Sequence, residues 1–177
     1  MGDNSLSHRK YYTGVGSRQT PPRALLTIDS VAARIAQHGY IMRSGGAGGA
    51  DTAFAIATPP DQREIWVPWF GFNGSASKLV PTPEAFEIAA QHHPGWERLG
   101  RGARGLHARN VHQVLGADLK TPSHFVLCWT PDGAETRTSS ETGGTGQAIR
   151  IAIAYGVPVI NMQRPWREWT ARVKEML

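Results

Sequence analysis

Apolar residues recur along the chain in two alternating periods, one typical of buried strands and the other of amphipathic helices. Short apolar runs predict strands over residues 11–16, 40–43, 64–68, 123–129 and 157–161. Helical spacing predicts helices over residues 23–38, 52–57, 83–92, 105–115, 145–155 and 166–176. Gly39 and Gly156 directly follow two of these helices, where glycine favours helix termination.

Strands that alternate with helices in this way predict βαβ units around a parallel sheet. The continuous apolar run over residues 123–129 is typical of a strand buried on both faces. We therefore predict an α/β fold, a single doubly wound Rossmann-like domain with about five parallel strands and helices on both faces. The domain spans residues 11–177 and follows an N-terminal tail of residues 1–10.

The composition restricts the class of protein. A chain of 177 residues with 40% hydrophobic residues is long enough for its own core. The single cysteine, Cys128, excludes an internal disulfide, and no apolar run reaches the roughly 20 residues that a membrane span needs. The N-terminus has no apolar stretch of the secretory type, so we expect a cytoplasmic protein with no membrane partner.

The charge favours an anionic partner. Nineteen basic residues stand against fourteen acidic residues, which gives a net charge of +5, and only four of the basic residues are lysines. Arginine's planar guanidinium forms bidentate hydrogen bonds to phosphate, so the excess of arginine over lysine favours phosphate or nucleic acid as a partner. On charge alone, a basic surface with no partner explains the balance equally well.

Three glycine clusters, at residues 14–18, 44–51 and 141–147, follow three different predicted strands. Because the carboxyl ends of parallel strands meet at one edge of the sheet, we expect the clusters to form one rim there. At least two of them open a helix, where free amides and the helix dipole attract anions. The rim therefore predicts a phosphate or nucleotide site. None of the clusters matches the dinucleotide or Walker A pattern, so we expect no cofactor.

These motifs carry a family resemblance. Gly16-Ser17-Arg18, the Ser44–Asp51 block (SGGAGGAD), Arg109-Asn110 and the glycine-rich turn at Gly143–Gly146 form one pattern. The pattern resembles the Rossmann-like SLOG superfamily, which includes DprA (Smf) proteins and LOG-type cytokinin-activating hydrolases. Within the superfamily the chain is most similar to short DprA-like proteins of phages and prophages, over about residues 11–162. The resemblance implies nucleotide or single-stranded DNA binding, and a homodimer.

Two departures from the family pattern bear on activity. Aligning the glycine turn with the LOG motif puts Arg150 where the catalytic glutamate of those hydrolases belongs. An arginine neither takes up nor delivers a proton near pH 7, so the resemblance implies binding without catalysis. The Arg-Asn-Arg motif of DprA is present only as Arg109-Asn110-Val111, which lacks one positive charge.

Two carboxylates are weak candidates to replace the missing glutamate. Asp51 and Glu141 lie on the predicted rim, as does Asp132, and a carboxylate near a ribose can act as an acid or a base. A loop brace or helix cap is the favoured interpretation of Asp51, and a solvated loop residue that of Glu141. The histidines show no metal-ligand spacing, so no metal site is expected.

Aromatic and basic residues near the rim have two interpretations each. Trp69 and Trp129 follow or end strands, where they would either stack on a nucleobase or pack in the core. The arginine-rich stretch over residues 101–109 would either track a phosphodiester backbone or form a flexible surface loop.

Three functions follow from these residues. The first is non-catalytic binding of a nucleotide or nucleotide-derived ligand, which in a phage-like protein would sequester a signalling nucleotide. The second is DprA-like binding of single-stranded DNA, and the third is LOG-like cleavage of an N-glycosidic bond. The predicted ligand-binding residues are Gly16, Ser17, Arg18, Ser44, Gly45, Gly46, Gly48, Gly49, Asp51, Trp69, Arg109, Asn110, Trp129, Gly143, Gly144, Thr145 and Gly146.

Overall fold

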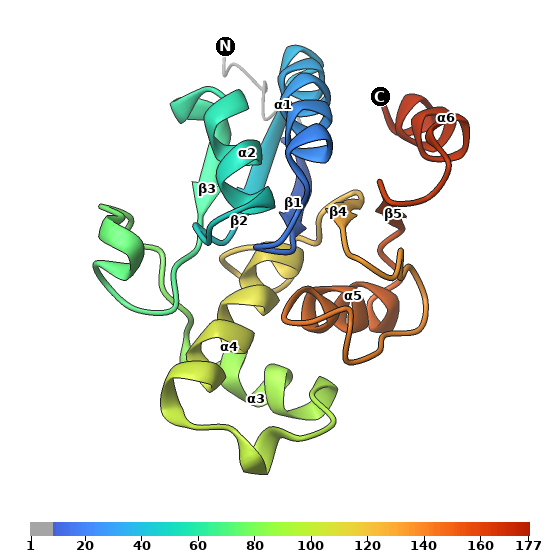
Figure 1. The fold of residues 1–177 in the computed structure, drawn as a ribbon. Helices are drawn as coiled ribbons and strands as arrows, with labels where there is room; N and C mark the ends of the chain where they lie inside the picture. The colour runs from blue at the N-terminus through green and yellow to red at the C-terminus, as the bar shows by residue number, and fades with distance from the viewer. Residues whose placement is uncertain (1–8) are drawn as a thin grey trace.

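Five strands pair side by side in one parallel sheet (Figure 1). The computed structural model describes residues 9–177. The strands are β1 (Lys10–Gly16), β2 (Tyr40–Ser44), β3 (Arg63–Ile65), β4 (Val126–Trp129) and β5 (Val159–Asn161), in the order β3-β2-β1-β4-β5. The register places Thr13 of central β1 opposite Arg43 of β2 on one side and Val126 of β4 on the other.

Helices cover both faces of the sheet, in two separate layers (Figure 1). One core forms under α1 (Pro22–Gln37), α2 (Ala50–Ala57) and α6 (Trp166–Met176), and the other under α3 (Pro83–His92), α4 (Arg101–Leu115) and α5 (Thr145–Ala154). Three short 3₁₀ helices lie in connections: η1 (Pro60–Gln62), η2 (Phe72–Gly74) and η3 (Trp96–Arg98). The predicted doubly wound α/β fold with five parallel strands is confirmed.

Some element boundaries differ from those predicted. Helix α4 begins at Arg101, so the arginine- and glycine-rich stretch is helical and not a loop. Gly105 of this helix lies against the segment after β3, since a Cβ there would be 3.4 Å from the Pro68 carbonyl oxygen, an ordinary contact distance. Strand β4 begins only at Val126, since the Ser123 amide donates to Val114 of α4.

Two further expectations concern the ends of the chain and membranes. Residues 1–8 of the predicted tail lie outside the described residues, and Lys10 already belongs to β1. Within residues 9–177, no helix combines the length and apolar character that crossing a bilayer requires.

The glycines of β1 allow α2 to pack directly against the sheet. A Cβ at Gly14 would lie 2.7 Å from the Phe54 ring, and one at Gly16 would lie 2.7 Å from the Ala50 side chain. Such distances are below any real carbon contact, so larger residues would push the helix away from the strand. The N-terminus of α2 is thereby held close to the carboxyl end of β1.

The order of the strands reverses beside β1. From β1 the chain moves outward through β2 and β3, then returns across α3 and α4 to enter β4 on the other side of β1. In open parallel sheets, ligands bind outside the carboxyl ends of the strands at such a switch point. The ends of β1 and β4 therefore mark where a site is expected.

A buried arginine connects the sheet edge to the segment before β4. Arg43 is only 2% exposed, and its Nε lies 3.0 Å from Glu64 Oε2 on the neighbouring strand. Its Nη1 donates to the Thr121 carbonyl at 2.7 Å, and its guanidinium lies 3.7 Å from the centroid of the Tyr11 ring. Glu64 supplies the negative charge that a buried guanidinium needs.

Glu64→Ala should lower the free energy of unfolding by about 1–3 kcal/mol, because it leaves the buried Arg43 charge without its counter-ion. Urea denaturation followed by circular dichroism would measure the change. Glu175→Ala is the matched control, since Glu175 is exposed and no ion pair involves it within residues 9–177. Equal midpoints for the two variants would contradict a stabilising role for the pair.

Candidate ligand-binding cleft

A cleft of about 890 Å³ opens at the switch point, over the carboxyl ends of β1 and β4. Its walls come from the loop after β1, the start of α2, η2, one side of α4, and the loop that leads into α5. The lining residues are Val15, Gly16, Ser17, Arg18, Gln19, Ala47, Asp51, Phe72, Asn73, Ala103, Leu106, His107, Arg109, Asn110, Gln113, Pro131, Ser140, Glu141, Thr142, Gly143, Gly144, Thr145 and Ala148.

Asp51 joins the first two glycine loops beneath the cleft. Its Oδ1 accepts the Gly16 amide and its Oδ2 accepts the Ala47 amide, both at 3.3 Å. Burial raises the pKa of Asp51 to about 6, although the Arg109 charge and these amides act in the opposite direction. The loop amides that were expected to hold phosphate are thus partly occupied by the protein's own carboxylate.

The floor of the cleft carries buried polar atoms that have no partner. Arg109 is 8% exposed and donates through Nη1 to the Gly45 carbonyl, while its Nε has no acceptor within residues 9–177. Gln113 is 1% exposed, and neither its amide nitrogen nor its amide oxygen is hydrogen-bonded there. Each unsatisfied buried group costs about 1–3 kcal/mol, so a bound polar ligand or ordered water is expected at this floor.

Gly45 explains how these side chains come together. A Cβ at this position would lie 2.3 Å from Gln113 Nε2 and 2.8 Å from both Arg109 Cζ and Asp51 Oδ2. Only a residue without a side chain leaves room for three polar groups against the backbone. Gly45 therefore shapes the floor from below without lining the cleft itself.

The N-terminus of α5 faces the cleft from the opposite wall. The amides of Gly144 and Thr145 donate to no acceptor within the described residues, and the Gly144 carbonyl accepts Asn110 Nδ2 at 3.1 Å. Free amides and the positive end of the helix dipole favour an anion at this wall. Exposed Arg18 lies on the rim and adds a positive charge.

Asp132 braces the loop that leads into α5. Its carboxylate accepts Thr142 Oγ1 at 2.5 Å and Ser139 Oγ at 2.8 Å. Partial burial raises the pKa of Asp132, but these hydrogen bonds outweigh it and hold the pKa below its ordinary value. Glu141 is exposed on the rim of the cleft, where its carboxylate makes no hydrogen bond to residues 9–177.

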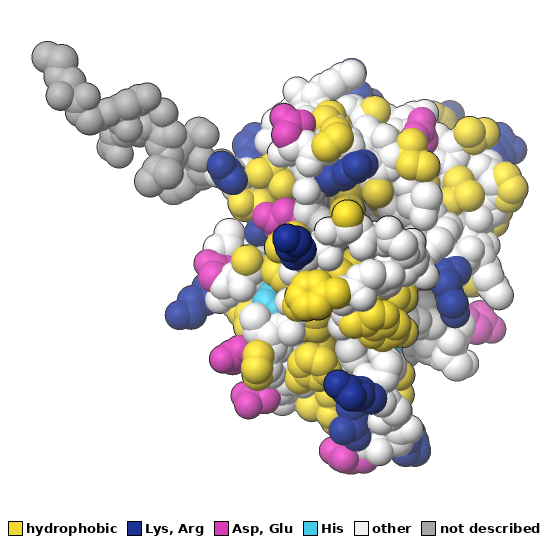
Figure 2. All heavy atoms as spheres, turned by 90° about the vertical axis from the view of Figure 1, so that its left-hand side faces the viewer, with side chains coloured by type: hydrophobic (Ala, Val, Ile, Leu, Met, Phe, Trp, Pro, Cys, Tyr) yellow, Lys and Arg dark blue, Asp and Glu magenta, His cyan; other side chains and the backbone are white. Residues whose placement is uncertain are grey.

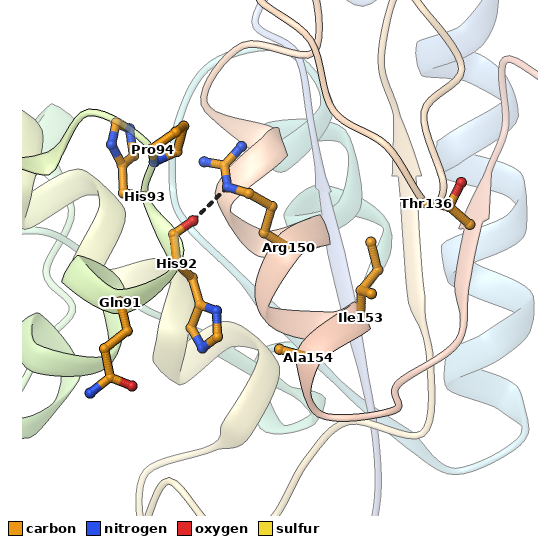
Figure 3. Close-up of a pocket in the computed structure, with 8 residues that line it drawn as sticks. All are labelled: Gln91, His92, His93, Pro94, Thr136, Arg150, Ile153 and Ala154. Atoms are coloured by element: carbon orange, nitrogen blue, oxygen red, sulfur yellow. Dashed lines mark hydrogen bonds between the residues drawn. The ribbon is translucent and has the colours of Figure 1, made fainter.

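Arg150 does not line the cleft and instead connects three segments; Figure 3 shows its contact with the His92 carbonyl. Its Nε donates to the His92 carbonyl at 2.7 Å, Nη1 to Thr138 Oγ1 at 2.9 Å and Nη2 to Gln147 Oε1 at 2.8 Å. It lines a separate hollow of about 460 Å³ with Gln91, His92, His93, Pro94, Thr136, Ile153 and Ala154. With all three nitrogens engaged, Arg150 acts as a structural brace.

The cleft includes only part of the predicted set. Gly16, Ser17, Arg18, Asp51, Arg109, Asn110, Glu141, Gly143, Gly144 and Thr145 line it, whereas Ser44, Gly45, Gly46, Gly48, Gly49, Trp69, Trp129 and Gly146 do not. Trp129 is 6% exposed and packs in the core under α1 and α2. Trp69 is 46% exposed and does not line the cleft, but its ring contacts that of Phe72, which does.

Sequence reasoning missed Leu106 and Gln113, whereas Phe72 was expected near the rim and lines the cleft. Leu106, Arg109, Asn110 and Gln113 are spaced i, i+3, i+4, i+7, which places them on one face of α4. Since Arg109 had been assigned to the site, this spacing could have predicted that Gln113, one helical turn further on, lies there too. Among residues 9–177, no three His, Cys, Asp or Glu side chains are grouped as a metal site would require.

Comparison with known proteins adds information on the fold. No family model and no curated protein sequence matches the chain. The X-ray structure of DNA processing protein A (DprA) from Streptococcus pneumoniae is similar, with a TM-score of 0.51 and 19% sequence identity over 86% of this chain. The match covers 50% of that protein, so the chain spans about half its length.

A second similar structure is DprA from Helicobacter pylori, which was described for its single-stranded DNA binding mode. The TM-score is 0.40 and the identity 13%, over 98% of this chain and 85% of that one. The first of these structures, from Streptococcus pneumoniae, confirms at the level of the Rossmann-like fold the resemblance to DprA proteins that the sequence motifs predicted, together with the α/β class.

Proposed function

We propose that the cleft binds a nucleotide or a nucleotide-derived molecule, without chemical turnover. The observation that carries the proposal is the set of buried polar atoms on its floor that have no partner within residues 9–177, namely Arg109 Nε and both amide atoms of Gln113. The Arg109 guanidinium suits phosphate, and the Gln113 amide offers one acceptor and two donors to a base or sugar. A ligand that satisfies them removes the cost of leaving them unpaired.

The walls favour a nucleotide over a bare phosphate ion. Free amides of Gly144 and Thr145 and the charge of Arg18 provide for the phosphate. Apolar Phe72 and Leu106 line the same space and provide contacts for a base or sugar. The volume of about 890 Å³ is within the range of small-molecule sites, roughly 300–1,000 Å³, and exceeds the needs of phosphate alone.

A binding role without catalysis is supported by where the carboxylates lie. Arg150, at the position of the family glutamate, braces α5 from the side away from the cleft. Asp51 is engaged by two loop amides beneath the floor, and Glu141 has no neighbouring group that would hold it against a ribose.

Single-stranded DNA is a second candidate ligand. The first turn of α4 carries Arg101, which is exposed, and Arg104, and the same helix lines the cleft with Ala103 and Leu106. Cations on a helix that lines the cleft suit a phosphodiester backbone, which binds by release of counter-ions. Both candidate ligands contain nucleotide units, so the first quantity to measure is the affinity of the cleft for a single nucleotide.

Gly144→Val should abolish binding of nucleoside monophosphates while the melting temperature stays unchanged. A Cβ at Gly144 meets no atom within 4 Å, so the side chain would fill the cleft beside the α5 amides without straining the fold. Titration calorimetry with AMP, GMP, CMP, UMP and dTMP would measure the loss. Gly100→Val is the matched control, because its Cβ is equally free and lies outside the cleft. Equal affinity in the two variants would contradict the proposal.

Ligand affinity should rise as the pH falls from 7.5 to 5. Asp51, with a pKa of about 6, becomes protonated over this range and loses a negative charge beside the anion, while His107, whose pKa burial lowers to about 4, stays neutral. Removing one repulsive charge at a few ångströms is worth roughly 1 kcal/mol or more, about a fivefold gain. Thymidylyl-thymidine is the suitable probe, because the charge of its phosphodiester is constant here. In Asp51→Asn the affinity should not depend on pH over this range. A pH dependence that persists in this variant would contradict the assignment of the effect to Asp51.

Incubation with adenosine, guanosine or cytokinin-type nucleotides should release no free base or ribose phosphate. Asp51 is held by the Gly16 and Ala47 amides, and the family glutamate is replaced by Arg150, so we expect chromatography to show only the starting compound. Release of a base by the wild-type chain but not by Glu141→Gln would replace the binding role with N-glycosidase activity.

A further inference from the structure

Three aromatic residues follow β3 in one short segment: Trp69, Phe70 and Phe72. Trp69 is 46% and Phe70 is 68% exposed, which is unusual for side chains of this size. Figure 2 shows the side of the molecule that carries β3 and η2, where hydrophobic side chains gather over the centre and Lys and Arg side chains flank them. We call these three residues the aromatic ledge.

The ledge is continuous with the floor of the cleft. Phe72 lines the cleft, and the guanidinium of Arg109 lies 5.3 Å from the centroid of its ring. Trp69 meets Phe72 edge to face, with centroids 5.3 Å apart. Rings therefore extend without a break from the buried cation to the exposed surface.

Helix α4 supports the ledge from below. Cβ atoms at Gly102 and Gly105 would lie 3.8 Å from the Trp69 ring, at ordinary van der Waals distance, so the indole lies over this side of α4. Exposed Arg101 directly precedes Gly102 and lies one turn from Gly105, which puts it on the same side of α4 as Gly105. No described acidic side chain pairs with Arg101.

Trp69 and Phe70 have exposed ring surfaces, and Phe72 connects them to the cleft. Together with Arg101, which forms no ion pair with a described residue, these rings suit one kind of ligand. Bases of single-stranded nucleic acid stack on such rings while cations follow the backbone. A protein partner would need a broader apolar surface, whereas this ledge adjoins a cleft floor of polar and charged groups.

We propose that Trp69 and Phe70 are stacking subsites for the bases of a single-stranded oligonucleotide whose first nucleotide occupies the cleft. The strand leaves the cleft past Phe72, stacks its next bases on Trp69 and Phe70, and passes a phosphate to Arg101. This inference rests on the proposed function of the cleft and extends its ligand from a single nucleotide to a strand.

The test compares dTMP with the octamer (dT)8 in wild-type, Trp69→Ala and Phe70→Ala chains, by titration calorimetry. Loss of one stacked base should weaken (dT)8 binding by about 5- to 150-fold and leave dTMP binding unchanged. Phe70→Ala removes a largely exposed ring, so its result holds even where Trp69→Ala lowers the melting temperature. Trp166→Ala is the matched control, since Trp166 is 66% exposed on α6, beyond the opposite edge of the sheet.

The outcomes separate the ledge from the cleft. Binding of dTMP together with unchanged (dT)8 affinity in both ledge variants would overturn the subsites and leave the cleft proposal standing. Absence of binding for both probes in the wild type would overturn both proposals. Selective loss of (dT)8 affinity is the expected result, with tryptophan fluorescence quenched in the wild type by (dT)8 but not by dTMP, and with this quenching reduced in Trp69→Ala.

Discussion

The carboxylate of Asp51 organises the rest of the cleft. It accepts amides from the loops after β1 and β2, and it lies against Gly45, where no side chain could be accommodated. Buried carboxylates need compensation, and here the amides and the charge of Arg109 provide it. Gly45 and Gly49 of the block around it therefore serve close packing, since a Cβ at either would lie less than 3.0 Å from neighbouring atoms. The loop amides without an acceptor among residues 9–177, those of Gly144 and Thr145, lie on the α5 side of the cleft.

One face of α4 provides the floor of the cleft. Leu106, Arg109 and Gln113 recur at helical spacing, so a single straight element brings an apolar wall, a cation and an amide to the same floor. Leaving Arg109 Nε and the Gln113 amide without partners lowers the stability of the unliganded protein. Buried polar atoms that lower the free energy of unfolding in this way are typical of binding sites.

Arg150 has a structural role at a position that the sequence resemblance singled out. Where the motif of LOG-type hydrolases would place a glutamate, this chain has a guanidinium that joins α5 to α3 and to the loop before α5, and Figure 3 shows its contact with His92. The amides of Gly144 and Thr145, at the start of the same helix, have no acceptor within residues 9–177. What this helix end can do therefore depends on the residues of the site and not on the fold.

The sequence by itself determined the α/β class and much of the rim. Alternating periods predicted the sheet, and since the carboxyl ends of parallel strands meet at one edge, Gly16, Arg18 and Gly144 were placed correctly around one cleft. Only the tertiary structure decided which way side chains face. Trp129 packs in the core while Trp69 lies at the surface, although both follow or end a strand. That difference depends on strand register and on contacts between distant segments, such as α4 against the loop after β3, which local sequence patterns do not encode.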